Sequence, residues 1–353
     1  MVKNIPCAIF VAVTIMVISS KLAFSSDLAK QTIDQLKIEA DKGDPPAQYE
    51  LGCKYYYADG VPKDNVQAVQ WWQKSAEKGD LSADVALGFA YEKGVAVKQD
   101  FGQAVKWYGK AANQKDPEGE FFLALCYAFG RGVPKDIQKA VLLCEEAAMA
   151  GLRQAQRTRG VGFYYGDVGY TQDDTKAFFW FKKAAAQGDP PANYYLGLCY
   201  ENGRGTETNL VEATKCLRVA ADADYANAED ELGTCYVYGR GIGQNFSQAG
   251  SWLKKAADQG NPEGQMHLGL MCLYGVGVEK DSVEAYKWFI LASLKDQATG
   301  NVGFVIMKKY GFHLTSDEIA EAMRRVDLFK VAHLDKFNNP NGTNDFPIFI
   351  FNH

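Results

Sequence analysis

The sequence predicts an all-α protein, an α-solenoid of seven helical hairpins of 36 residues with N- and C-terminal capping helices. Three observations predict this fold. A phrase that begins with Leu-Gly returns along the chain at a spacing of 36 residues. The apolar residues inside each copy follow a helical period, and the 34 glycines are spread over the copies instead of forming one tract.

The composition is that of a globular protein. Hydrophobic residues make up 47% and charged residues 23% of the chain, which excludes disordered, collagen-like and polytopic membrane proteins. The formal net charge of −5 is mildly acidic, so the chain lacks the positive charge that nucleic-acid binding requires. We therefore expect a buried core and no nucleic-acid partner.

Residues 1–25 have the layout of a secretory signal peptide. Lys3 precedes an apolar run from Ile5 to Ile18, and small residues follow up to Ser25. We expect cleavage after Ser25 and export to the periplasm or the medium, with an uncleaved N-terminal anchor as the alternative. The rest of the sequence has no apolar stretch long enough to span a bilayer, so no membrane insertion is expected after cleavage.

A capping half-repeat is predicted for residues 26–46, followed by seven repeats over residues 47–299. Leu36 and Ala40 are in phase with Trp72 and Ala76 of the first full repeat, which indicates a helix equivalent to the second helix of a hairpin. The reference positions of the seven repeats, 36 residues apart except for one spacing of 37, are Leu51, Leu87, Leu123, Arg159, Leu196, Leu232 and Leu268.

Each repeat reads as two helices separated by glycines. A glycine directly after the reference leucine, such as Gly52, has no Cβ, so two helices can approach closely there. Turns of the GRGV type, as at Gly130 and Gly239, end the first helix, and an Asp or Asn then caps the second. Gly-Asp-Pro at Gly43 and Gly188 ends the second helix.

The pattern LGxxYxxGxGVxxDxxxAxxWxxKAAxxGD, which recurs over more than two thirds of the chain, resembles the Sel-one-like repeat (SLR) family. This resemblance to relatives of the tetratricopeptide repeat implies a right-handed α-solenoid that binds a partner protein or peptide on its concave face, without catalysis. The stretch AYKWFILAS at Ala285 resembles the last repeat of bacterial members, and LTSDEIAEAMRRV at Leu314 resembles their capping helix.

Capping helices are accordingly predicted for residues 300–337. Thr315 and Glu318 have the spacing of a capping box at the start of the last helix. An apolar stripe that would pack on the last repeat follows: Ile319, Met323, Val326 and Phe329.

Similarity to tetratricopeptide repeats places the partner groove on the first helices, at the positions two residues before and two, five and six residues after each reference position. The candidate residues lie at the first and the last of these. The large residues at these positions are Tyr49, Tyr57, Phe121, Phe129, Arg157, Tyr165, Tyr194, Tyr238, Met266 and Tyr274. Large aromatic residues that vary from repeat to repeat are typical of recognition surfaces. The alternative is that these rings seal one repeat against the next.

The fourth repeat departs most from the pattern, with Arg159 in the place of the reference leucine. Together with Arg157 it could bind an acidic partner segment or a phosphate. The alternative is a side chain that pairs with Glu145 or Glu146. A run of acidic residues between repeats five and six, from Asp222 to Glu231, is interpreted as a solvated face.

Seven cysteines follow residue 25. Two pairs each connect the helices of one hairpin and are candidate disulfides, Cys126 with Cys144 and Cys199 with Cys216. Buried thiols that act as small apolar side chains are the alternative. No cysteine and histidine cluster with zinc-ligand spacing is present, so no metal and no other cofactor is expected.

The sequence offers little material for catalysis. It contains four histidines and neither a GxSxG nor an HExxH motif. SxxK occurs at Ser75 and at Ser251, but the repeat frame gives both serines ordinary helix positions. The predicted function is therefore a non-enzymatic scaffold, and the alternative is an enzyme or wall-binding protein that acts on a peptidoglycan-like or β-lactam ligand.

Residues 338–353 change from polar to apolar and are predicted to be a flexible tail. Two alternatives are that its apolar part, residues 346–351, lies in the protein's own groove or adds as a strand to a partner.

Overall fold

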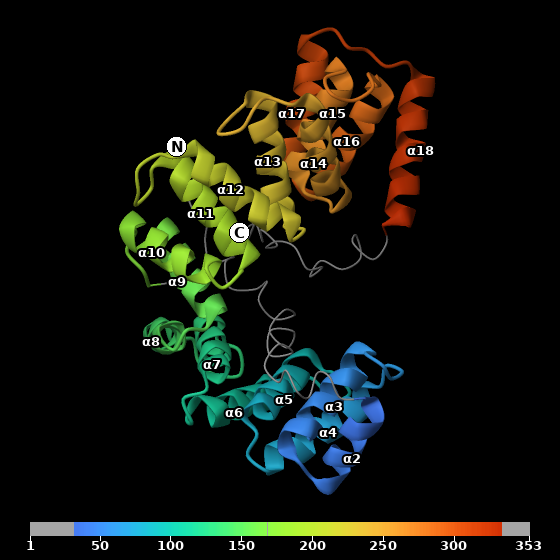
Figure 1. The fold of residues 1–353 in the computed structure, drawn as a ribbon. Coiled ribbons are helices and arrows are strands. Elements are labelled where there is room, and N and C mark those ends of the chain that lie inside the picture. Colours follow the sequence, from blue (N-terminus) through green and yellow to red (C-terminus); the bar gives the residue numbers. More distant parts are fainter. Residues whose placement is uncertain (1–31, 168, 334–353) are drawn as a thin grey trace. The chain divides into compact units, whose positions relative to one another are not determined.

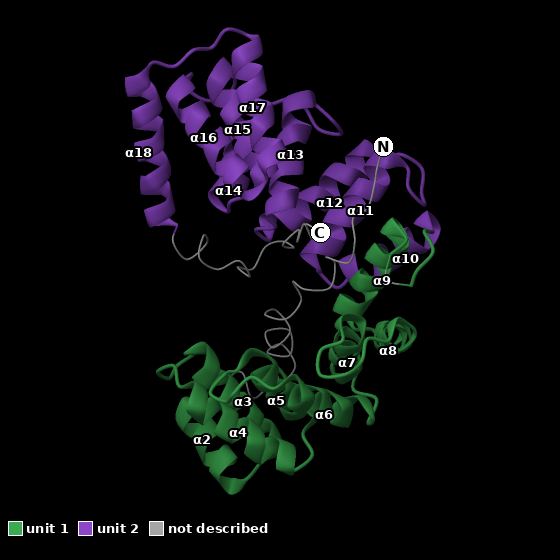
Figure 2. Cartoon of the chain, turned by 180° about the vertical axis from the view of Figure 1, so that it is seen from behind, with its two compact units in different colours: residues 1–172 green, residues 173–353 purple. Residues whose placement is uncertain are grey.

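The computed structural model describes residues 32–167 and 169–333, and within these residues it contains seventeen α-helices and no strand (Figure 1). The predicted signal peptide and the tail lie outside the described residues. The chain divides into two compact units, Met1–Gln172 and Asp173–His353 (Figure 2). The boundary falls inside the fourth repeat, between its first and its second helix.

Unit 1 begins with the predicted capping helix, in which Leu36 and Ala40 are buried. Three hairpins follow, each built from two consecutive helices that pack on each other and on the next hairpin. The helices are α2 (Ile33–Lys42), α3 (Pro45–Tyr57), α4 (Asn65–Glu77), α5 (Leu81–Lys93), α6 (Phe101–Ala112), α7 (Pro117–Phe129), α8 (Ile137–Met149) and α9 (Arg153–Tyr165).

Unit 2 starts with the second helix of the fourth repeat, and three hairpins and the C-terminal helices follow. The first helices of its last two hairpins, α13 and α15, contact each other directly. The helices are α10 (Asp174–Ala185), α11 (Pro190–Asn202), α12 (Leu210–Asp222), α13 (Ala226–Tyr238), α14 (Phe246–Asp258), α15 (Pro262–Tyr274), α16 (Ser282–Lys295), α17 (Gln297–Lys309) and α18 (Ser316–Ala332).

The helix ends follow the predicted capping pattern. Asp64 accepts hydrogen bonds from the backbone N–H groups of Val66 and Gln67, at 2.9 and 3.0 Å, at the start of α4. Gly130 and Gly239 end α7 and α13 in the left-handed conformation, with φ of 68° and 69°. Residues with a side chain rarely adopt these angles, so the position of these two turns depends on glycine.

The glycine after the reference leucine lets the two helices of a hairpin touch. A Cβ at Gly52 would lie 2.6 Å from the ring of Trp72, and one at Gly88 would meet the ring of Tyr108. The facing residue is twenty positions later in each case, and the same holds for Gly269 and Phe289. The predicted close approach is therefore confirmed.

The second glycine of the turn has a separate role, which the sequence analysis did not identify. A Cβ at Gly132 would clash with the carbonyl oxygen of Phe101, the first residue of α6 in the preceding hairpin. Gly241 faces the first residue of α12, Leu210, in the same way. This glycine therefore sets how closely one hairpin stacks on the next.

The C-terminal capping box is confirmed, since Thr315 and Glu318 bond reciprocally at the start of α18. The predicted apolar stripe is only half right. Val326 and Phe329 are buried, but Ile319 and Met323 are 38% and 46% exposed. Helix α18 packs on α16 through a face rotated away from them, on which Ala322 is fully buried.

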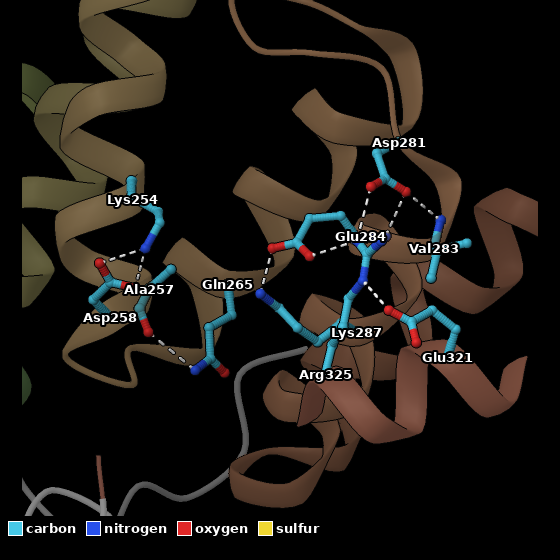
Figure 3. Close-up of polar contacts among 10 residues, drawn as sticks. All are labelled: Lys254, Ala257, Asp258, Gln265, Asp281, Val283, Glu284, Lys287, Glu321 and Arg325. Carbon is cyan, nitrogen blue, oxygen red and sulfur yellow. Dashed lines mark hydrogen bonds and ion pairs between the residues drawn. The ribbon is translucent and has the colours of Figure 1, made fainter. Parts of the chain in front are cut away.

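An ion network holds α18 to the last hairpin (Figure 3). The guanidinium of Arg325 lies 2.8 Å from Asp281, 3.1 Å from Glu284 and 3.0 Å from Glu321 of its own helix. Glu284 also pairs with Lys287, whose ammonium lies over the ring of Trp288. The two acidic partners on α16 and its N-cap therefore fix the register of α18.

We predict that Gly88→Ala lowers the free energy of unfolding by about 1–3 kcal/mol, because the new methyl group overlaps a fully buried tyrosine ring that is hydrogen-bonded to Glu92. Gly109→Ala in α6 is the control. No atom lies within 4 Å of a Cβ there, so alanine should be neutral or stabilise by up to about 1 kcal/mol. Denaturant unfolding measures both, and equal stability of the two variants would contradict the close-approach role.

A second prediction concerns the cap. Arg325→Met should lower the stability of the C-terminal end by about 1–2 kcal/mol, because Asp281 loses its cationic partner and Glu284 keeps Lys287 alone. Arg324→Met is the matched control, since Arg324 is 62% exposed and pairs with Glu321 of its own helix. Hydrogen exchange of the α18 amides should accelerate in the first variant alone. An equal change in both would mean that general charge, and not the network, holds the helix.

Candidate interaction site

The positions six residues after the reference residue carry exposed aromatic side chains. In unit 1, Tyr57 and Tyr165 are 37% and 39% exposed, and Phe129 is half-buried. In unit 2, Tyr238 and Tyr274 are 72% and 45% exposed. Each is the last residue of a first helix, directly before the residue that ends it in the left-handed conformation.

Neighbouring side chains support these rings. The rings of Tyr57 and Tyr56 meet edge to face with centroids 4.9 Å apart, and Tyr165 meets Tyr164 at the same distance. The guanidinium of Arg240 lies 5.8 Å from the ring centre of Tyr238. A ring held in this way loses little conformational entropy when a partner covers it, which suits a recognition surface.

The positions two residues before the reference residue behave differently. Phe121 is fully buried and packs against Phe122, so its assignment to the groove is wrong. Tyr194 is half-buried and contacts Tyr225, the residue before α13, at a centroid distance of 5.4 Å. Tyr194 therefore seals one repeat against the next, which was the alternative interpretation, and Phe121 is a core residue. Tyr49, Arg157 and Met266 are half-buried as well.

Arginines in the turns bind the preceding hairpin, which the sequence analysis missed. Arg131 lies 3.4 Å from Glu92, Arg240 pairs with Glu201, and the Nε of Arg204 lies 3.0 Å from Asp174. The sequence does contain a signal for these contacts, because the turns at the three arginines all read Gly-Arg-Gly. Arg131 and Arg240 also lie 5.0 and 5.8 Å from the ring centres of Phe129 and Tyr238, so each unit has a cation beside a predicted groove residue.

The acidic run before the sixth repeat is not a solvated face throughout. Asp230 is 5% exposed, and its Oδ1 lies at hydrogen-bond distance, 2.7 Å, from Nδ1 of His267 on α15. Burial by itself lowers the pKa of His267, but the hydrogen bond and charge of Asp230, with the charges of Glu231 and Glu263, raise it overall. Glu229 is fully buried beside Gln259, whereas Asp222 and Asp224 are exposed as expected.

Arg159 is paired inside the fold, as the alternative interpretation proposed. Its Nη1 lies 2.9 Å from Glu145 Oε1, and its guanidinium lies about 6 Å from the rings of Phe163 and Tyr170. Glu146 instead pairs with Lys115. Arg159 therefore replaces the reference leucine without leaving a buried charge unpaired. The role of Arg157 in binding an acidic partner stays a prediction.

The candidate disulfides are absent from the structure, in which Cys126, Cys144, Cys199 and Cys216 are free thiols. The sulfur of Cys144 lies 3.8 Å from the carbonyl oxygen of Ala155 in α9, so it faces the next hairpin. Burial raises the pKa of Cys126 and Cys144 to about 12, which keeps both protonated and unreactive at neutral pH.

The two SxxK serines have structural contacts. The hydroxyl of Ser251 donates to the carbonyl oxygen of Ser247 in its own helix, and the ammonium of Lys254 pairs with Asp258 (Figure 3). Ser75 is buried and donates to the carbonyl oxygen of Pro45 at 2.7 Å. Neither hydroxyl is bonded to the lysine of its motif, which a serine nucleophile with a lysine base would need.

Among the helices of residues 32–333 that the structure describes, none is long and apolar enough to cross a bilayer. The same residues contain no group of three His, Cys, Asp or Glu side chains arranged to hold a metal ion.

The chain is similar to known repeat proteins over most of its length. A Sel1 repeat protein from Oxalobacter formigenes is 29% identical, with a TM-score of 0.57 over 96% of this chain and 94% of that chain. A protective antigen of uropathogenic Escherichia coli with an SLR fold is 28% identical, with a TM-score of 0.50 over 87% of this chain and 73% of that chain.

A curated relative matches a shorter part. DAP3-binding cell death enhancer 1 from Rattus norvegicus is 41% identical over 81 residues, which are 23% of this chain and 15% of that protein. This chain thus spans far less than two thirds of that relative.

The Sel1 repeat model matches seven consecutive segments that together exceed half of the chain: residues 45–80, 81–116, 117–152, 155–189, 190–225, 226–261 and 262–296. Proteins with these repeats typically mediate protein interactions. With the hairpins of each unit and the solved structures that share them, these matches show that the chain belongs to the Sel1 repeat family.

Proposed function

We propose that the chain is an exported scaffold without catalytic activity that binds a partner protein or peptide through the first helices of its repeats. One observation carries this proposal. Exposed aromatic residues recur at one frame position, in unit 1 at Tyr57 and Tyr165 and in unit 2 at Tyr238 and Tyr274. Each unit therefore presents its own exposed aromatic residues.

The cost of leaving such rings in water supports a binding role. Packing residues in this chain repeat and are buried, as Ala47, Ala83 and Ala192 show at the fourth position before the reference residue. The residue six positions after the reference residue instead changes from repeat to repeat. It is exposed where it is Tyr57, Lys93 or Asn202, and half-buried where it is Phe129. Variation of this kind suits specificity for a partner, since it leaves the core unaltered.

Export rests on residues 1–25, whose layout is that of a secretory signal. Free thiols of high pKa are compatible with an oxidising compartment, because protonated buried thiols react slowly. The partner is therefore expected in the envelope or in the medium.

The test is affinity capture from the envelope or the culture medium with residues 26–353 as bait, followed by a measured Kd for the captured partner. Replacing Tyr57, Tyr165, Tyr238 and Tyr274 with Ala should weaken binding about tenfold or more, with little change in melting temperature, because these rings contact solvent in the free chain.

The matched control removes the same kind of surface from second helices. It replaces Leu142, Met149, Phe179 and Val219, which are 49–70% exposed, with Ala. Its affinity should equal that of the unaltered chain. Phe121→Ala should instead lower stability by about 3–5 kcal/mol, as a core residue does. An equal loss of affinity in both quadruple variants would contradict the proposed face.

A further inference from the structure

An aromatic cluster is exposed at the C-terminal end of unit 2. We call Tyr274, Tyr310 and Phe312 the C-terminal aromatic patch. The ring of Tyr274 meets that of Phe312 at a centroid distance of 6.0 Å and that of Tyr310 at 6.5 Å, both edge to face. Tyr274 is 45% and Tyr310 60% exposed, while Phe312 is half-buried against the core of unit 2.

The patch lies where a solenoid normally ends in polar residues. Terminal repeats of such proteins need a polar outer surface, because no further repeat covers them. Here α17 ends directly before Tyr310, and the same helix exposes Val302 and Val305 by 45% and 64%. We therefore expect another segment or molecule to cover this apolar surface.

The chain itself carries a segment of matching chemistry. Residues 346–351 read Phe-Pro-Ile-Phe-Ile-Phe, and the polar residues 338–345 precede them. Three phenylalanines and two isoleucines in six residues provide aromatic and branched side chains, which pack favourably against tyrosine and phenylalanine rings.

The length of the connecting chain allows the contact. Helix α18 has 17 residues, so it is ~25 Å long, and Phe312 lies three residues before its N-cap. The segment must therefore return past one length of this helix. The twelve residues 334–345 can span ~40 Å when extended, which is enough.

The charges are complementary as well. The ammonium of Lys280 lies 5.9 Å from the ring centre of Phe312, and that of Lys309 lies 5.4 Å from the ring centre of Tyr310. Both lysines are exposed. Asp345 directly precedes the apolar segment, so its carboxylate would reach the patch beside these cations.

We propose that residues 346–351 dock on the C-terminal aromatic patch of the same chain. Because the segment is tethered, its effective concentration at the patch is on the order of millimolar, so a weak contact is sufficient. Tyr274 is also one of the two tyrosines of unit 2 that we propose to contact a partner, so the docked segment competes with a partner at that position. The docking itself does not depend on the proposed function.

The test measures side-chain accessibility by hydroxyl-radical footprinting of the full chain without any partner. In the variant with Phe346→Ser, Phe349→Ser and Phe351→Ser, oxidation of Tyr274 and Tyr310 should rise several-fold. Tyr57 and Tyr238 are internal controls, because they lie outside the patch, and their rates should not change. The three substitutions lie outside the described helices, so we expect the fold to be retained.

Two further measurements identify the occupant. Adding a synthetic peptide of residues 344–353 to the triple variant should restore protection of Tyr274 and Tyr310, and Asn338→Ser with Asn339→Ser should leave protection unaltered. Three results would overturn the proposal: unchanged rates in the triple variant, a change that spreads to Tyr57 and Tyr238, or protection that depends on protein concentration. The last result would assign the patch to a second copy of the chain. Since no partner is present, failure here leaves the proposed scaffold function untouched.

Discussion

The contact between a glycine of the first helix and a large side chain of the second is the constraint on which the hairpins depend. Within the described residues it occurs in five repeats, each time with a partner twenty positions later. In the third repeat Ala124 stands in place of glycine, and the residue twenty positions later is the small Cys144. Both are buried, so the extra methyl group is balanced by a smaller neighbour. This explains the cysteine better than a disulfide does.

A second constraint acts between hairpins. Three residues before the reference position, Gln48 donates to the carbonyl oxygen of Ala40 at 3.0 Å, and Gln156 and Gln265 do the same to carbonyl oxygens eight residues earlier. In the second repeat this position is Asp84, which cannot donate. There Lys110 donates to the equivalent carbonyl oxygen of Ala76 and also binds Asp84. A lysine of the facing helix thus replaces the missing donor, so the polar register between hairpins is kept.

The fold was predictable from the sequence because its determinants are local and repeated. The glycines that end helices, the Asp and Asn caps and the period of the apolar residues each act within a few residues, so a spacing reveals them. The prediction of the apolar stripe on α18 was half wrong, because it depends on tertiary packing and not on a local signal. Ile319 and Val326 both fit a helical period, and only the packing of α18 on α16 decides which of them is buried.

The candidate site was less predictable from the sequence. Large aromatic residues occur both two positions before and six positions after the reference residue. Phe121 and Tyr238 are both large aromatic residues, but Phe121 is fully buried and Tyr238 is 72% exposed. The structural difference is that Tyr238 is the last residue before a left-handed glycine, where the backbone turns away and no next helical turn covers the side chain. Phe121 has two further turns of α7 after it and lies between neighbouring helices. The end of the first helix is therefore where this chain can vary a large side chain without altering its core, and the left-handed turn at Gly239 leaves the ring of Tyr238 exposed.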